Sequence, residues 1–227
     1  MNARTGRVVG ILFILGTASG SVSAALLSPI LEGPELLPQA AEHPTQLLLG
    51  VVCILIMAFS LAMIPVFAYP VLRERSEVVA LGYFLMRGAV ETLTYVLTVL
   101  SWLVLLAVAR SADVGEASQV GYDVMTELFI RVDHAIGQVV TVLVFSLGAL
   151  LFYYALFRYR FVPRWLSGWG LLAATLWLGA GVMVMFSVLE PWSTLQILLA
   201  IPIAVQELVL AVWLIVRGFN TAAPEGP

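Results

Sequence analysis

The chain has 227 residues, of which 61% are hydrophobic and only 11% are charged, and its mean hydropathy is +1.02. Soluble domains carry roughly 45–50% apolar and about 25% charged residues, so this composition indicates an integral membrane protein without a soluble domain. The net charge of −3 and the lack of a long basic run exclude a nucleic-acid partner.

Missing residue types exclude several kinds of chemistry. All 11 basic residues are arginines, which excludes a lysine nucleophile or a lysine Schiff base. The single cysteine, Cys53, permits neither an internal disulfide nor a Cys-pair metal site. The histidines are His43 and His134, so one chain cannot build a three-histidine zinc site. We expect no cofactor.

Six apolar runs are long enough to cross about 30 Å of hydrocarbon at about 1.5 Å per residue. Small residues near the end of the first run also fit a signal peptide, but its length favours an uncleaved span. The predicted spans are residues 8–27, 46–72, 78–109, 124–157, 165–189 and 194–216. Short connections predict an all-α, up-and-down bundle in residues 1–219, followed by a disordered tail at residues 220–227.

Prolines indicate a loop after the first span and a break near the end of the second. The polar stretch 28–45 contains three prolines and reads as a loop with space for a short helix at the membrane interface. Pro65 and Pro70 lie near the end of the second span and are expected to kink or terminate it.

The arginines predict the orientation of the bundle. In the alternating topology, eight fall on one side: Arg4, Arg7, Arg73, Arg75, Arg158, Arg160, Arg164 and Arg217. The other side has Arg110, and Arg131 if that residue lies outside the hydrocarbon. Because cytoplasmic loops carry the excess of arginine, we expect both termini in the cytoplasm.

Two polar stripes run through otherwise apolar spans. Arg87 and Glu91 are four residues apart in the third span, so a helix places both on one face. Their stripe continues through Thr94, Thr98 and Ser101, and the fourth span has a stripe of Glu127, Arg131, His134, Gln138 and Thr141. The two stripes are expected to face each other or a shared interior, because the spans are neighbours in the chain.

Depth divides these polar residues into two predicted layers. The inner layer comprises Arg87, Glu91, Gln206 and Glu207. The outer mouth comprises Glu127, Arg131, Asp133 and His134, with Glu190 as a further candidate. Ionisable residues inside a membrane usually have partners and often a role. The outer mouth has possible metal ligands, but one histidine without cysteine is an unusual zinc set, so we predict no metal site.

Three motifs and a fourth short one resemble the bacterial DUF4386 family of small multi-span membrane proteins. They are RxxGxLFxLG at residues 7–16, RYRFVPRWLSG at 158–168, QE at 206–207 with LAVWLIVRG at 210–218, and HxxG at 134–137. The resemblance implies a bacterial inner-membrane protein with an uncleaved first span. It draws attention to His134, Pro163, Arg164 and Glu207, and it supplies no chemistry.

The first functional hypothesis is binding or transport of a small amphiphilic or lipid-like ligand, coupled to protons. Its pocket would be lined by Arg87, Glu91, His134, Gln138 and Glu207. Arg87 would anchor an anionic group, and Glu207 would carry the proton. The alternatives are a structural subunit of a membrane complex or homo-oligomer, and a membrane enzyme with His134 and a carboxylate as acid and base. Membrane lipids are expected partners in every case.

Overall fold

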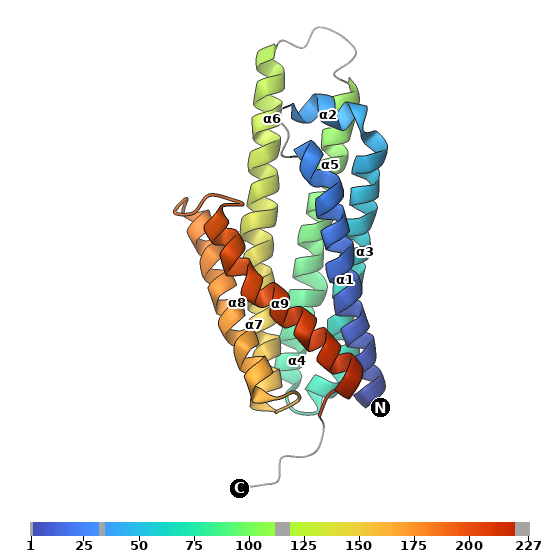
Figure 1. Cartoon of the computed structure of the whole chain (residues 1–227), viewed down its shortest axis with the longest axis vertical. Helices are drawn as coiled ribbons and strands as arrows, with labels where there is room; N and C mark the ends of the chain where they lie inside the picture. Colours follow the sequence, from blue (N-terminus) through green and yellow to red (C-terminus); the bar gives the residue numbers. More distant parts are fainter. Residues whose placement is uncertain (1, 32–34, 112–118, 221–227) are drawn as a thin grey trace.

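The computed structural model describes residues 2–31, 35–111 and 119–220, which are helical apart from short connections (Figure 1). Six helical runs within these ranges are long and apolar enough to cross a membrane. No strand occurs in this part of the chain. The prediction of an all-α fold with six spans is therefore confirmed.

The spans run alternately up and down the bundle. The first and second are α1 (Asn2–Leu31) and α3 (Pro44–Arg73), and the short α2 (Leu36–Glu42) lies across their ends (Figure 1). The other four spans are α4 (Glu77–Tyr83) with η1 (Phe84–Val90) and α5 (Glu91–Ser111); α6 (Gln119–His134) with η3 (Ala135–Thr141) and α7 (Val142–Arg158); α8 (Arg164–Met185); and α9 (Thr194–Arg217). η1 and η3 are π-helical.

The start of α1 and the end of α9 lie at the same end of the bundle, termed here the terminal end, and α2 lies at the far end (Figure 1). The fifth span ends at Met185, before the predicted residue 189, because the backbone turns at Ser187 with φ of 55°. Of the predicted tail at residues 220–227, Asn220 is described and its amide donates to the Phe161 carbonyl, while residues 221–227 lie outside the described residues, as do residues 112–118.

The prolines of the second span do not end it. α3 continues through Pro65 and Pro70 and ends at Arg73. Neither proline terminates the helix at its own position, because in a membrane span the neighbouring helices support a helix that has lost one internal hydrogen bond. α1 and α9 likewise contain Pro29 and Pro202.

Glycines bring α1 close to both of its neighbours. A Cβ atom on Gly16 would lie 2.8 Å from the Leu61 side chain of α3. A Cβ atom on Gly10 would lie 2.5 Å from the Ala211 carbonyl oxygen of α9. Small residues permit this approach in lipid, where van der Waals packing is a main source of helix association. The first helix therefore joins the second and the last.

An aromatic core fills the half of the bundle near the terminal end. Tyr83 stacks on Phe152 with ring centroids 4.5 Å apart, and Phe13 lies 6.4 Å from Phe152. Leu27, Leu36 and Leu105 belong to a second buried cluster, which joins α1, α2, α3 and α5 at the far end. α1 and α3 contribute buried residues to both clusters and so connect the two halves of the bundle.

We expect Gly10→Ala to destabilise the protein by about 1–3 kcal/mol, because the added methyl group meets a backbone oxygen that cannot move alone. Gly179→Ala in α8 is the matched control, since its Cβ atom would meet nothing within 4 Å. The control should be neutral or more stable by up to about 1 kcal/mol from helix propensity. Thermal unfolding in detergent measures both, and equal shifts would contradict the tight α1–α9 contact.

Candidate functional site

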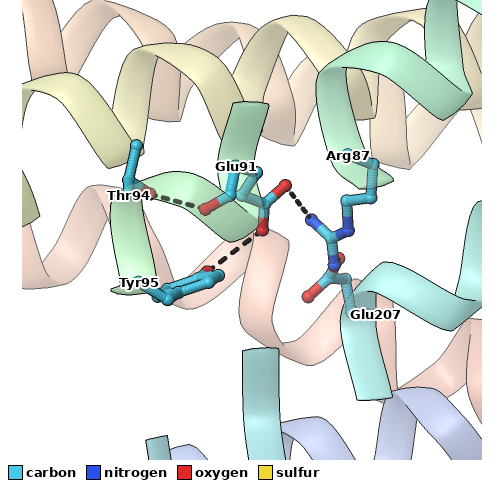
Figure 2. Close-up of polar contacts among 5 residues, drawn as sticks. All are labelled: Arg87, Glu91, Thr94, Tyr95 and Glu207. Carbon is cyan, nitrogen blue, oxygen red and sulfur yellow. Dashed lines mark hydrogen bonds and ion pairs between the residues drawn. The ribbon is translucent and has the colours of Figure 1, made fainter. Parts of the chain in front are cut away.

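The centre of the site is Arg87, whose side chain is 2% exposed. Its Nη1 atom donates to Glu91 Oε2 at 3.3 Å, and its Nη2 atom donates to Glu207 Oε1 at 3.2 Å. Figure 2 shows the guanidinium between the two carboxylates. Arg87 lies in the third span and Glu207 in the sixth, so the ion pairs tie together distant parts of the chain.

Local backbone structure places this arginine. Arg87 lies in π-helical η1, and the Glu91 amide that follows this segment donates to the Met86 carbonyl. A π-helical turn inserts an extra residue into an α-helix and is frequent at functional sites. The side chains of Arg87 and Glu91 still meet on one face, as their spacing of four predicts.

Two aromatic rings hold the guanidinium. Its Cζ atom lies 4.7 Å from the centroid of the Phe145 ring of α7 and 5.7 Å from that of Phe13 of α1. A cation over an aromatic ring gains about 2 kcal/mol or more when water is excluded. With its two carboxylate partners, Arg87 therefore joins the first, third, fourth and sixth spans.

The two carboxyl groups differ in their surroundings. The Glu91 side chain is 0% exposed and accepts a second hydrogen bond, of 3.0 Å, from the Tyr95 hydroxyl. Thr94 Oγ1 donates to the Glu91 backbone carbonyl at 2.7 Å (Figure 2). The Glu207 side chain is 15% exposed and receives its hydrogen bond from Arg87. Glu91 is thus fixed within the cluster, and Glu207 is the more accessible carboxyl group.

Several buried polar atoms near the terminal half of the bundle lack a hydrogen-bond partner among the described residues. They are Arg87 Nε, Thr92 Oγ1, Ser146 Oγ, the Tyr153 hydroxyl and Gln206 Oε1. Buried polar groups are nearly always hydrogen-bonded, so each such atom needs an explanation. Arg87 Nε belongs to the ion-pair cluster itself, which leaves the cluster one unused donor.

The two predicted glutamines of the ligand pocket form their bonds elsewhere. Gln138, in η3, accepts from Gln196 Nε2 at 2.9 Å, and Gln196 Oε1 in turn accepts from the Trp192 amide at 2.6 Å. Gln206 Nε2 donates to the Leu166 carbonyl at 3.1 Å and ties α9 to α8. Both glutamines thus hold α9 in place with bonds outside the charge cluster: Gln206, although adjacent to Glu207, bonds to α8, and Gln138 bonds to the start of α9.

The residues predicted for the outer mouth come together in part. Arg131, His134 and Glu190 line one surface pocket of about 370 Å³ between the fourth span and the α8–α9 turn. Arg131 also forms an exposed ion pair of 2.6 Å with Glu127, with side chains 75% and 65% exposed. Asp133 lies apart from this pocket and accepts from Trp102 Nε1 of α5 at 2.8 Å. No three His, Cys, Asp or Glu side chains gather as metal ligands within the described ranges.

The fourth span explains this separation. Its apolar part, Asp123–Arg158, runs for 36 residues, or roughly 54 Å, so His134 lies far along it from the terminal end. Arg87 lies near the start of the third span, close to that end. The His134 side chain is therefore separate from the Arg87 cluster, and no described hydrogen bond joins it to a carboxylate.

Sequence reasoning missed five residues that shape the site, one of which is Tyr95, four residues after Glu91 and bonded to it. Phe13 and Phe145 carry no signal of their own, because aromatic residues are frequent throughout the spans. Trp102 is likewise one apolar residue among many. Gln196 carries a usable signal, since an amide within an apolar span needs a partner and Gln138 is the obvious candidate.

The sequence matches a known protein family. The family described as "Domain of unknown function (DUF4386)" has a model that matches residues 8–218. The match covers nearly the whole chain, and the chain belongs to this family. No curated protein and no solved structure matches it.

We expect Arg87→Met to destabilise the protein by about 3–5 kcal/mol, because it leaves two buried carboxyl groups without their cation. Arg131→Met is the control, since its ion pair is exposed and should contribute less than about 1 kcal/mol. Thermal unfolding and gel filtration in detergent measure the difference. Similar stability in both variants would contradict a central role for Arg87.

Proposed function

We propose that this member of the DUF4386 family binds or transports a small amphiphile in exchange for a proton at Glu207. One observation carries the proposal: a single buried guanidinium lies between two carboxyl groups. When both carboxyl groups are ionised, the cluster has one surplus negative charge. An unpaired charge in a membrane interior is costly, so the surplus favours either a proton or a cationic group at this place.

Glu207 is the carboxyl group suited to this exchange. Glu91 is fully buried and bonded to both Arg87 and Tyr95, whereas the Glu207 side chain retains 15% exposure. The titratable groups around Glu207 are Arg87, Glu91, Tyr83, Tyr95 and Tyr153. Arginine and tyrosine keep their protons at neutral pH. Of these groups, the two carboxyls are therefore the ones that exchange a proton.

The same geometry favours a cationic ligand over an anionic one. Both terminal nitrogens of Arg87 are engaged with carboxylates, so an anionic group would have to displace one of them. A cationic amphiphile instead compensates the surplus charge without breaking the Arg87–Glu91 pair. The geometry thus favours pairing of Glu207 with a cation over the sequence-based hypothesis that Arg87 anchors an anion, which stays a prediction.

Helix α9 supplies an element that can respond to the exchange. Pro202 lies inside α9, five residues before Glu207, and cannot donate a backbone hydrogen bond to the preceding turn. Kinks and hinges in helices concentrate at such prolines. Release of Glu207 from Arg87 would break the contact between the middle of α9 and the third span, while Gln196 and Gln206, which both precede Glu207 in α9, keep their bonds to Gln138 and Leu166.

A structural role is the second candidate. Arg87 and Glu91 are almost fully buried, and Arg87 is held by contacts from four spans. These facts favour a cluster that fixes helix positions in a subunit of a membrane complex. The two candidates differ in one respect: a purely structural cluster gives no pH-dependent binding at Glu207.

The proposed location is the inner membrane of a bacterium, with both termini in the cytoplasm. The six apolar helices make this a multi-pass membrane protein. The argument for orientation is the arginine distribution, because Arg73, Arg158 and Arg217 end helices at the terminal end. An excess of arginine marks the cytoplasmic side.

The test measures binding of dodecyltrimethylammonium, a cationic amphiphile, to the purified full chain between about pH 5 and pH 9. Competition with one proton predicts that affinity rises with pH, by up to about tenfold per pH unit, and levels off once Glu207 is ionised. Glu207→Gln should keep the fold, since a glutamine oxygen still accepts from Arg87, and should lose the pH-dependent binding.

Glu127→Gln is the control, because it removes an exposed carboxyl group far from the cluster. It should bind the probe as the parent protein does. Unchanged binding and pH dependence in a folded Glu207→Gln variant would overturn the exchange and favour the structural role. Proteoliposomes with a trapped pH dye then distinguish binding from transport.

A further inference from the structure

A second polar site lies at the terminal end, where the turn between α7 and α8 meets the end of α9. The Asn220 amide donates to the Phe161 carbonyl at 2.8 Å, and the rings of Phe161 and Phe219 contact edge to face with centroids 6.2 Å apart. Phe161, Val162 and Phe219 are each at most 5% exposed. The α7–α8 turn and the residues after α9 are therefore fixed against each other, and together they form the base of a pocket.

This pocket has a volume of about 630 Å³ and is lined by three arginines. Arg160, Arg164 and Arg217 line it together with Trp213, and none of the described residues that line it is acidic. None of the three guanidiniums has a carboxylate partner within the described ranges. Arg164 instead lies over the Phe157 ring, with its Cζ atom 5.4 Å from the centroid. This set is termed the arginine pocket.

The backbone concentrates further positive charge there. Arg160 has φ of 55° and Gly218 has φ of 71°, so both flanking segments turn sharply at the pocket. α8 begins at Arg164, and its N-cap residue Pro163 supplies no side-chain hydrogen bond. The unsatisfied amides and positive dipole end of a helix N-terminus favour an anion. They add to three unpaired guanidiniums in one concave site.

The position of the pocket indicates the kind of anion. Trp165, adjacent in the chain to Arg164, is 57% exposed, and Trp213 lines the pocket beside Arg217. Exposed tryptophans near helix ends mark the level of lipid headgroups. Arginine forks match the oxygens of phosphate and bind them with two hydrogen bonds at once. A carboxylate would satisfy one such fork, whereas a phosphate can engage several.

We propose that the arginine pocket binds a phosphate group, supplied by the headgroup of an anionic phospholipid or by a soluble phosphate. Binding in the pocket can be distinguished from attraction to the general positive charge of this end. Arg73 and Arg75 carry charge at the same end but lie outside the pocket. The proposal rests on other residues than the Glu207 exchange and is independent of it.

The experiment uses native mass spectrometry of the full chain in detergent with phosphatidylglycerol, with phosphatidylcholine and with inorganic phosphate. The paired variant Arg164→Gln/Arg217→Gln should weaken phosphatidylglycerol binding by about tenfold or more, because two charge-assisted contacts are lost. The matched control Arg73→Gln/Arg75→Gln removes the same charge at the same end and should bind as the parent protein does. Thermal unfolding confirms that both variants fold.

The outcomes separate the sources of the phosphate. Binding of phosphatidylglycerol that excess inorganic phosphate does not displace assigns the site to a lipid headgroup. Displacement, or binding of inorganic phosphate alone, assigns it to a soluble phosphate. Equal loss of phosphatidylglycerol in the pocket and control variants, or no loss in either, would overturn the proposal and leave only the general charge of this end.

Discussion

A buried arginine cannot stand alone in a membrane, and the arrangement of the bundle follows from how Arg87 is satisfied. Its carboxylate partners come from the third and sixth spans, and its aromatic contacts come from the first and fourth. Helices in lipid lack a hydrophobic driving force for association, so contacts of this kind have a large share in fixing their positions. The close approach of α1 to α9 at Gly10 is compatible with the same geometry, because it brings the Phe13 helix alongside that of Glu207.

The far half of the bundle is held in a different way. There α2 covers an apolar cluster, and the polar contacts are a pair of amides, Gln138 and Gln196, and the Trp102–Asp133 hydrogen bond. Contacts between neutral amides carry a smaller desolvation cost than an ion pair, whereas Asp133 is a carboxyl group whose described partner is the Trp102 indole N–H. The terminal half is distinguished by one arginine shared between two carboxyl groups and by buried donors without a described partner. Function is expected where the charges do not balance.

Much of this could be predicted from the sequence, and the failures have physical causes. Six spans follow from apolar runs longer than the bilayer is thick, and the Arg87–Glu91 contact follows from helical spacing. The position of Glu207 along the sixth span predicted that it lies at the same depth as Arg87 and Glu91. The placing of Gln138 in one ligand pocket with Arg87 and Glu207 came from its stripe on the fourth span. A stripe gives a face but no partner, and the partner Gln196 lies on α9. Of the two outcomes expected at Pro65 and Pro70, termination occurs at neither, because neighbouring helices support α3, and a kink stays a prediction.

The distribution of charge connects the two polar regions without requiring contact between them. The surplus in the Arg87 cluster is negative, and the surplus in the arginine pocket is positive. Both regions involve α9, through Glu207 in its middle and Arg217 at its end. A helix that carries Pro202 between fixed ends can respond to a change at Glu207 while Phe219 and Asn220 keep its end on the α7–α8 turn. Movement of α9 would thus be limited to the stretch between Gln196 and Gln206, which contains Pro202, since the end that bears the arginine pocket is anchored and Gln206, next to Glu207, is bonded to Leu166.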